Sequence, residues 1–422
     1  MASYCCYLGM PSQNYGMLLL VLRHVETFLN AIDTAGGLPG QGFAAVKLTA
    51  LGNPVLLERM SSAILTVRGL FQRFDMDKSG FIDMSEFLTA YQQIFPFSSA
   101  KEAGRTFSHF DQASLGKVDY VAWCQALSLR QMPGIAESII QSYGHQPEMQ
   151  GWLGDLSASC LTQNEYELVL AMRQRLETIV ERAVSKSVKL MVDAEHSYFQ
   201  PAIDHMTLRL MKKYNKQGNA VIFNTYQAYL RSTHMRLKVD MERAHREGYQ
   251  FACKLVRGAY MNLERDRAAQ QGYPSPVWDC LEETHACYEG CLRTVMEEVA
   301  AGRAEVLFGS HNEDSIQLAV QLMHDLNLKA GSSPVYFGQL LGMADHLTYT
   351  LGNHGYPAFK YVPYGLVHEV IPYLLRRAQE NASMLKGARA DMMLLQAELK
   401  RRALSELKRR ALLIASKCQS VN

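Results

Sequence analysis

Seven short runs of apolar residues, many of them β-branched, recur along the chain and are separated by longer stretches in which apolar residues have helical spacing. The runs cover residues 43–48, 188–195, 220–226, 251–260, 304–312, 334–339 and 358–364. Such apolar runs are typical of strands that are buried on both faces of a parallel sheet. The repeated alternation of strand and helix predicts an α/β fold, either a barrel or a doubly wound sheet.

Reactive side chains fall at or near the C-terminal ends of these predicted strands. They are Lys47, Asp193, Tyr226, Arg257, His311, Gln339 and Tyr361. In a (β/α)8 barrel the C-terminal strand ends meet at one mouth, where active sites are built. No GxGxxG turn follows any strand, so the sequence gives no sign of a Rossmann phosphate site. We therefore predict a (β/α)8-type barrel, in which one strand–helix unit, expected before residue 43, is not evident.

Composition excludes several classes of protein. The formal net charge of +2 gives no reason to expect a nucleic-acid partner. The nine cysteines follow no zinc-binding spacing, so we predict reduced thiols and no zinc site. No apolar run reaches the roughly 18–20 residues that span a bilayer. The first 22 residues lack acids but also lack Lys and Arg, so no clear mitochondrial presequence is recognisable.

An additional folded module is expected between the first two predicted strands, because residues 49–187 are far too many for a loop. Within this interval, residues 75–86 read DMDKSGFIDMSE and match a calcium-binding EF-hand loop. Gly80 supplies the sharp turn. The predicted ligands, with the backbone carbonyl of Phe81 among them, are Asp75, Asp77, Ser79, Phe81, Asp83 and Glu86. We predict one Ca²⁺ ion here, and a purely structural clamp is as good an interpretation as a regulatory site.

A second copy of the loop, DQASLGKVDYVA, covers residues 111–122. Ala113, Leu115 and Ala122 replace the oxygen ligands of three positions. This loop is expected to keep the EF-hand shape without binding calcium. It should pack beside the first loop through Ile82 and Val118.

A charged helix is predicted near the C-terminal end of the last strand. After Gly365, apolar residues recur at helical spacing, and Arg376, Arg377 and Glu380 share one side of the helix. Two adjacent guanidinium groups suit a bidentate contact with a small carboxylate. From the spacing alone, a solvated helical face with ion pairs remains the simpler interpretation.

Longer motifs give the charged helix a more specific interpretation. They are VDAEHSYFQPAI, IFNTYQAYL, KLVRGAYMNLER, SHNEDS, YFGQLLGM and KYVPYG followed by PYLLRRAQEN. With these motifs in this order, residues 43–390, leaving out the inserted module, resemble the proline dehydrogenase family. The resemblance implies a barrel that holds FAD across its mouth, with proline stacked on the flavin.

The resemblance also implies roles for individual residues. Arg376 and Arg377 would bind the substrate carboxylate, with Glu380 in the same network. The other residues implied in the substrate site are Asp193, Tyr260, Leu340 and Tyr361. The residues implied to hold the FAD are Lys47, Asn224, Lys254, Arg257, Gly258, Ala259, His311 and Asn312.

The implied reaction is the oxidation of L-proline to 1-pyrroline-5-carboxylate, the first step of proline catabolism, with electrons passed to a quinone in mitochondria. Related hydroxyproline dehydrogenases have a smaller residue at the position of Tyr361, so proline is expected to be preferred over 4-hydroxyproline. Two alternatives stay open. The chain could oxidise hydroxyproline or another cyclic imino acid, or it could be a catalytically inactive, calcium-binding interaction protein. The oligomeric state is not indicated.

A basic amphipathic helix is predicted from Leu385 onward, where LKRRAL occurs at 399–404 and 407–412. It could pack on the barrel through its leucines, or contact the surface of the inner mitochondrial membrane through its basic residues. We divide the chain into a first part of the barrel, the inserted EF-hand pair, the remainder of the barrel with the catalytic helix, and this tail. Their ranges are 1–60, 61–132, 150–384 and 385–422.

Overall fold

The computed structural model describes most of the chain. The described residues are 13–37, 42–126, 129–131, 133–135, 137, 139, 152–216, 218–365, 367–380, 392–393 and 396–407. The side chains of a few residues in these ranges, Arg376 and Glu380 among them, lie outside the description.

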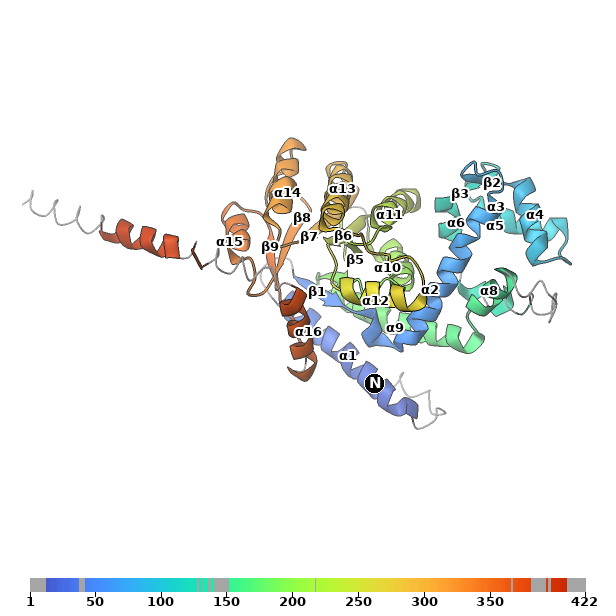
Figure 1. The fold of residues 1–422 in the computed structure, drawn as a ribbon, viewed down its shortest axis with the longest axis horizontal. Helices are drawn as coiled ribbons and strands as arrows, with labels where there is room; N and C mark the ends of the chain where they lie inside the picture. Colours follow the sequence, from blue (N-terminus) through green and yellow to red (C-terminus); the bar gives the residue numbers. More distant parts are fainter. Residues whose placement is uncertain are drawn as a thin grey trace, which may run out of the picture.

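Seven parallel strands form one curled sheet, a half-barrel, in which each strand pairs with the next one along the chain (Figure 1). They are β1 (Phe43–Val46), β4 (Lys189–Val192), β5 (Ile222–Gln227), β6 (Phe251–Val256), β7 (Ala304–Gly309), β8 (Val335–Leu340) and β9 (Ala358–Tyr361). All seven predicted strands are confirmed. Strand order follows sequence order without a reversal, which excludes the doubly wound sheet.

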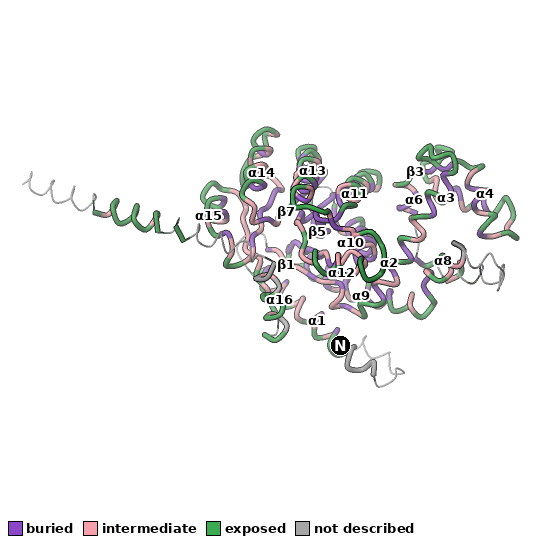
Figure 2. The backbone as a smooth tube through the Cα atoms, in the orientation of Figure 1, coloured by how far each residue is buried: buried purple, intermediate pink, exposed green. Residues whose placement is uncertain are grey.

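Helices connect successive strands and cover the outer face of the sheet (Figure 1). They are α9 (Gln163–Ser185), α10 (Gln200–Tyr214), α11 (Thr233–Glu247), α12 (Met261–Gln271), α13 (Leu281–Ala300), α14 (Glu313–Asp325) and α15 (Asp345–Asn353). α11 and α12 end at Gly248 and Gly272, whose positive φ angles of 68° and 72° suit the left-handed cap that glycine tolerates. Buried residues concentrate in the sheet and on the helix faces turned toward it (Figure 2).

Side chains connect the two edge strands, β1 and β9, which are not paired by a backbone ladder among the described residues. The rings of Phe43 and Phe359 are 4.6 Å apart between centroids. The hydroxyl of Tyr364 donates a hydrogen bond of 2.6 Å to the carbonyl oxygen of Ala45. The strand–helix unit expected before residue 43 is represented in the described residues by a helix alone, α1 (Gln13–Gly36), which packs against β1.

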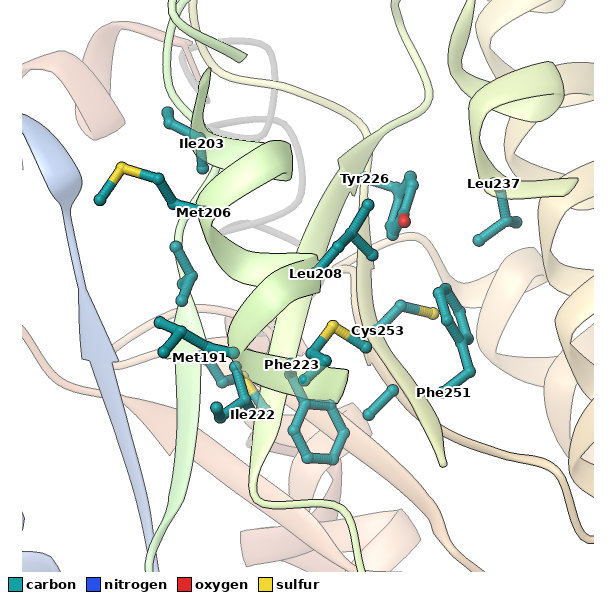
Figure 3. Close-up of a cluster of buried hydrophobic side chains, with 14 of the residues drawn as sticks. Met191, Ile203, Met206, Leu208, Ile222, Phe223, Tyr226, Leu237, Phe251 and Cys253 are labelled. Carbon is teal, nitrogen blue, oxygen red and sulfur yellow. The ribbon is translucent and has the colours of Figure 1, made fainter. Parts of the chain in front are cut away.

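Apolar side chains fill the space between strands β4–β6 and the helices α10 and α11 (Figure 3). Residues of this layer include Met191, Ile203, Met206, Leu208, Ile222, Leu237, Phe251 and Cys253. Burying one such large side chain contributes about 1.5–3 kcal/mol to folding. This packing fixes the strands, and with them the side chains at the C-terminal strand ends.

An inserted module follows β1 and a short 3-10 helix, η1 (Leu48–Leu51). Its elements are α2 (Pro54–Gly69), α3 (Phe71–Phe74), β2 (Phe81–Asp83), α4 (Met84–Ile94), α5 (Ala100–Phe110), β3 (Lys117–Asp119) and α6 (Tyr120–Ala126). β2 and β3 pair antiparallel with Ile82 opposite Val118, as predicted. The boundary that we set at 60/61 lies inside α2, which is one continuous helix shared by the barrel and the module.

One bidentate ion pair joins this module to the barrel. The guanidinium of Arg246, on α11, donates hydrogen bonds of 3.0 and 2.8 Å to the two carboxylate oxygens of Asp119. Asp119 also caps α6 by accepting from the backbone N–H of Ala122 at 2.9 Å. The contact therefore holds the second loop of the module against a barrel helix.

The segment that follows the module contains η2 (Leu129–Gln131) and α8 (Trp152–Ser159). After β9, α16 (Val367–Glu380) forms the predicted charged helix. Residues 396–407 are helical, and Leu399, Leu404 and Leu407 are exposed, so these leucines do not pack on the barrel. The remainder of the predicted tail lies outside the described residues. Among the described helices, none combines the length and apolar character that crossing a membrane requires.

Candidate functional site

A buried ion pair with a tyrosine against it lies at the C-terminal ends of three strands. Lys254, on β6, pairs with Oδ1 of Asp193, which follows β4 directly. The hydroxyl of Tyr361, at the end of β9, donates to Oδ2 of the same carboxylate at 2.9 Å. The ammonium of Lys254 also lies 5.4 Å from the centroid of the Tyr361 ring. Asp193 thus joins three residues that are far apart in sequence.

The charge of Asp193 is stabilised in spite of its burial. Burial alone would raise the pKa of this carboxyl, but the ammonium groups of Lys254 and Lys47 and the Tyr361 hydroxyl hold it below its usual value. Asp193 is therefore an ionised carboxylate at neutral pH. A fixed negative charge at this point can hold a cationic or hydrogen-bond-donating group of a ligand.

Lys47 and Tyr260 extend this cluster. The ammonium of Lys47, just after β1, donates to the hydroxyl of Tyr260 at 3.3 Å. Burial would lower the pKa of Lys47, but Tyr260, Asp193 and Glu195 together raise it, so the lysine is cationic. Tyr260 caps the beginning of α12, and the ring of His196 lies 4.3 Å from it. The structure therefore brings five of the predicted residues into one group: Lys47, Asp193, Lys254, Tyr260 and Tyr361.

His311 and Leu340 lie together on the neighbouring strand ends. Nε2 of His311 accepts a hydrogen bond of 2.9 Å from the backbone N–H of Leu340. Burial, with the charge of Lys360, lowers the pKa of His311 to about 4. The imidazole is thus neutral at pH 7, and its remaining proton is on Nδ1. Leu340 is the β-ladder partner of Tyr361, so the two residues are adjacent on the sheet.

Arg257 follows β6, and its guanidinium is partly buried among neutral acceptors. It donates to Nδ1 of His285 at 2.8 Å and to the hydroxyls of Ser310 and Ser315 at 2.9 Å each. Burial lowers the pKa of Arg257. The charge of this guanidinium is not paired with a carboxylate within salt-bridge distance in the described structure. Such a group fits a negatively charged ligand such as a phosphate.

Gly258 and Ala259 continue the turn after Arg257. Gly258 has a φ angle of 135°, and a Cβ atom built on it would lie 2.1 Å from the ring of Tyr229. A side chain at this position would need both a strained backbone and displacement of a tyrosine. The exposed backbone of Gly258 is therefore available for close approach by a ligand, and Ala259 is partly buried beside it.

Two of the residues predicted to hold the cofactor have other partners. Asn224 is fully buried, and its amide donates to Asp204 on α10 at 2.9 Å. Asn224 therefore lies on the helix-facing side of β5, away from the group around Asp193. Tyr226 faces the same side, with its hydroxyl bonded to Asp240 at 2.7 Å, and our placement of this side chain at the mouth is wrong. The side-chain oxygen of Asn312 caps α14 by accepting from Ser315 N–H at 2.9 Å.

The charged residues of α16 are described only in part. Arg376, Arg377 and Glu380 fall on the helix as predicted. The side chains of Arg376 and Glu380 lie outside the described residues, while Arg377 is partly buried. Several apolar residues of the helix, including Val367, Ile371 and Leu375, are exposed.

The structure adds residues that sequence patterns did not single out. His285 lies on α13 and holds Arg257 in place. Glu264, on α12, is fully buried and accepts from the backbone N–H and the hydroxyl of Ser197. Its carboxylate is also 3.5 Å from Nδ1 of His196, whose ring packs on Tyr260. The motif VDAEHSYFQPAI contains His196 and Ser197, but the buried acid that anchors them is about 67 residues further along the chain.

The first loop of the inserted module gathers acidic oxygens. Carboxylate oxygens of Asp75, Asp77 and Glu86 lie within 4.8 Å of one another. Asp75 is 8% exposed, and its Oδ1 is buried without a hydrogen-bond partner among the described residues. Ser79 donates to the carbonyl oxygen of Phe81 at 3.1 Å, which brings these two predicted oxygen ligands together. Asp83 and Glu86 form a reciprocal capping box at the start of α4.

The second loop differs at its first acid. Both carboxylate oxygens of Asp111 accept backbone N–H groups, from Leu115 and Gly116, at 2.8 Å each. In the first loop, by contrast, an oxygen of Asp75 lacks a protein partner. The chemistry of the two loops thus differs in the sense predicted from their sequences.

A curled parallel sheet with polar side chains gathered at its C-terminal strand ends defines the class of barrel-type α/β proteins that carry a site at that end. Residues 80–390 match the family model described as proline dehydrogenase. The chain therefore belongs to the proline dehydrogenase family.

Individual relatives agree with this assignment. Proline dehydrogenase 1, mitochondrial, of Bos taurus is 39% identical over 387 residues, which are 90% of this chain and 63% of the relative. Hydroxyproline dehydrogenase of Bos taurus is 42% identical over 254 residues, which are 59% of this chain and 55% of the relative. The chain thus spans less than two thirds of the length of either relative. A solved structure of proline utilization A from Bdellovibrio bacteriovorus, inactivated by N-propargylglycine, matches with 18% identity and a TM-score of 0.48, over 86% of this chain and 41% of that chain.

Proposed function

We propose that this chain is an FAD-dependent proline dehydrogenase that oxidises L-proline to 1-pyrroline-5-carboxylate in mitochondria and passes the electrons to a quinone. Its family and the name of its mitochondrial relative support the reaction and the compartment. The observation that carries the proposal is the Asp193–Lys254–Tyr361 group at the strand ends of a half-barrel, which supports the predicted (β/α)8-type architecture.

The residues present fit an FAD molecule. Arg257, whose guanidinium has only neutral partners, would bind its phosphates, with the backbone of Gly258 and Ala259 approaching closely. Lys47, Lys254, His311 and Asn312 would complete the cofactor site, whereas Asn224 would act indirectly, through Asp204. When bound, the flavin accepts the hydride, and the protein supplies orientation and electrostatics.

The protein's own residues would orient proline. The guanidinium groups of Arg376 and Arg377 would bind its carboxylate, and Glu380 would pair with them. Tyr361 and Leu340, adjacent on β9 and β8, would form a wall of the pocket. Asp193 stays ionised and would favour an amine nearby, while Tyr260 lines the same site beside Lys47. Fixed orientation of this kind is worth several kcal/mol of the barrier.

A hydroxyproline dehydrogenase is the second candidate, favoured by the 42% identity to the relative of that name. Tyr361 argues against it, because its hydroxyl is held by Asp193 and its ring would crowd a 4-hydroxyl group on the substrate. A catalytically inactive, calcium-binding interaction protein is the third candidate.

The first loop of the module is proposed to be an EF-hand that binds one Ca²⁺ ion, with the second loop as its inactive partner. The ligands would be Asp75, Asp77, Ser79, the carbonyl of Phe81, Asp83 and Glu86. The unpartnered Oδ1 of Asp75 supports this proposal, because a buried carboxylate oxygen needs a cation or a donor.

The basic tail is proposed to contact an anionic membrane surface, which would bring the flavin near its quinone. The exposed leucines at 399, 404 and 407 and the exposed Lys400 and Arg401 support this contact. Charge reversal at Lys400 and Arg401 should then reduce binding to anionic liposomes. Equal binding of both proteins would remove this part of the proposal.

Turnover separates the three candidate functions. The purified chain should convert L-proline to 1-pyrroline-5-carboxylate with a soluble quinone as acceptor. Arg377→Met should lower kcat/KM by a factor of about 100 or more through loss of a bidentate carboxylate contact, and Arg402→Met, in the exposed tail, should leave it unchanged. Turnover of 4-hydroxyproline alone would favour the second candidate, and no turnover of either substrate by FAD-loaded protein would favour the third.

A further inference from the structure

A cavity of about 590 Å³ lies between the inserted module and the outer helices of the barrel. Leu65 and Arg68 of α2 and Tyr120 of α6 line it from the module, and Asp240 and Arg243 of α11 line it from the barrel. None of the predicted site residues is among its lining residues. Its volume falls in the range of small-molecule sites.

Arg68 is the unusual group in this cavity. Its guanidinium makes no hydrogen bond or salt bridge to the described part of the protein, and its Nε is shielded from solvent. A buried donor left without a partner costs about 1–3 kcal/mol, and more when it is charged. A ligand with an anionic oxygen would remove this cost by accepting hydrogen bonds from Arg68.

The other charged residues of the lining are largely paired. Arg267 pairs with Glu58, and Arg236 pairs with Asp204 at 2.6 Å. Arg243 lies 3.3 Å from Glu247, outside the lining.

Asp240 is the remaining acid, and it accepts the Tyr226 hydroxyl at 2.7 Å. Burial and the neighbouring Asp204 raise the pKa of Asp240 to about 6, which weakens its negative charge near neutrality. The lining therefore has one cation in excess, located at Arg68.

Much of the remaining wall is apolar or aromatic. It includes Leu65, Leu230, Met235, Val239, Tyr198 and Tyr273. An inorganic anion would satisfy Arg68 but would leave these side chains in water. An organic acid with an apolar body would contact both parts of the wall.

We propose that this cavity binds a small monocarboxylate with an apolar body, whose carboxylate is held by Arg68. Because α2 and α6 form one wall and α10 and α11 the other, such a ligand would bridge the module and the barrel. The proposal does not depend on the reaction at the strand ends.

Calorimetric titration of the full chain with 4-phenylbutyrate, and with its neutral analogue 4-phenylbutanamide, tests the proposal. The acid should bind, and the amide should bind at least tenfold more weakly. Arg68→Met should weaken binding of the acid tenfold or more, while Arg105→Met, at an exposed position of α5, should not change it. No binding of the acid to the unchanged protein, or equal binding by Arg68→Met, would overturn the proposal.

Two further measurements keep the result interpretable. Arg68→Met removes a group that lacks a partner, so its Tm without ligand should equal or exceed that of the unchanged protein. A clear fall in Tm would instead indicate a structural role for Arg68 and count against the ligand site. If Arg377→Met abolishes binding of the acid and Arg68→Met does not, the acid binds the proposed proline site and the proposal is wrong. Equal affinity for inorganic phosphate would overturn the requirement for an apolar body.

Discussion

The hydroxyl of Tyr361 donates a 2.9 Å hydrogen bond to Oδ2 of Asp193, across 168 residues of sequence. The bond connects the end of β9, an edge strand, to the residue that follows β4. Because Lys254 holds the other carboxylate oxygen, the Tyr361 ring is fixed both by a hydrogen bond and by the nearby ammonium. A tyrosine held in this way forms a rigid wall, which is why its size can decide between substrates.

Shortening this wall should change substrate preference. Tyr361→Ser should raise kcat/KM for trans-4-hydroxy-L-proline relative to L-proline by tenfold or more, because the ring that crowds the hydroxyl is removed. Tyr361→Phe is the matched control, since it keeps the ring and loses only the bond to Asp193. Competition kinetics with both substrates measures the ratio, and an unchanged ratio in Tyr361→Ser would show that Tyr361 does not determine specificity.

The Lys254–Asp193 ion pair should stabilise the fold as well as the site. Lys254→Met leaves a buried carboxylate without its closest cation, which should lower the free energy of unfolding by about 3 kcal/mol at neutral pH. The double variant Lys254→Met/Asp193→Asn should be less destabilised than the sum of the single changes. Urea unfolding of the four proteins measures this coupling, and additive effects would mean that the two groups do not interact.

His311 should make stability depend on pH. Its pKa is about 4 in the folded protein and about 6.5 when unfolded, so the unfolded chain binds the proton first as the pH falls. The contribution is therefore complete above about pH 6.5 and is lost as the pH falls toward 4, by at most about 1.4 kcal/mol per unit. His311→Gln keeps an acceptor for Leu340 and should show a shallower loss of stability in this range. Parallel curves for the two proteins would contradict the prediction.

Calcium should stabilise the module through its first loop only. Added Ca²⁺ should raise the Tm of the unchanged protein, because an ion that binds only the folded state favours it. Glu86→Gln should abolish this shift, since the closing carboxylate is lost. Asp111→Asn, at the first position of the second loop, should retain it. A shift that survives in Glu86→Gln and disappears in Asp111→Asn would place the ion in the wrong loop.

The strands and the central group of the site follow from the sequence because their signals are local. Each strand is a continuous apolar run, and Lys47, Asp193 and Tyr361 stand at or next to the ends of such runs. Parallel strands in sequence order then bring these side chains together.

The direction of side chains within a strand could not be predicted in the same way. Every residue of β5 is buried, so no alternation of polar and apolar residues reveals which face Asn224 occupies. Partners contributed by distant helices, such as His285 for Arg257 and Glu264 for Ser197, have no local signal either. They depend on the packing of α12 and α13 on the sheet.

The most direct test of the proposed function is an anaerobic absorbance titration of the purified, FAD-loaded chain with L-proline. Loss of the oxidised-flavin band as proline is added would establish the cofactor, the reaction and the substrate together, and this is the result we predict. Bound flavin that keeps its oxidised spectrum at saturating L-proline would contradict the assignment of proline as substrate.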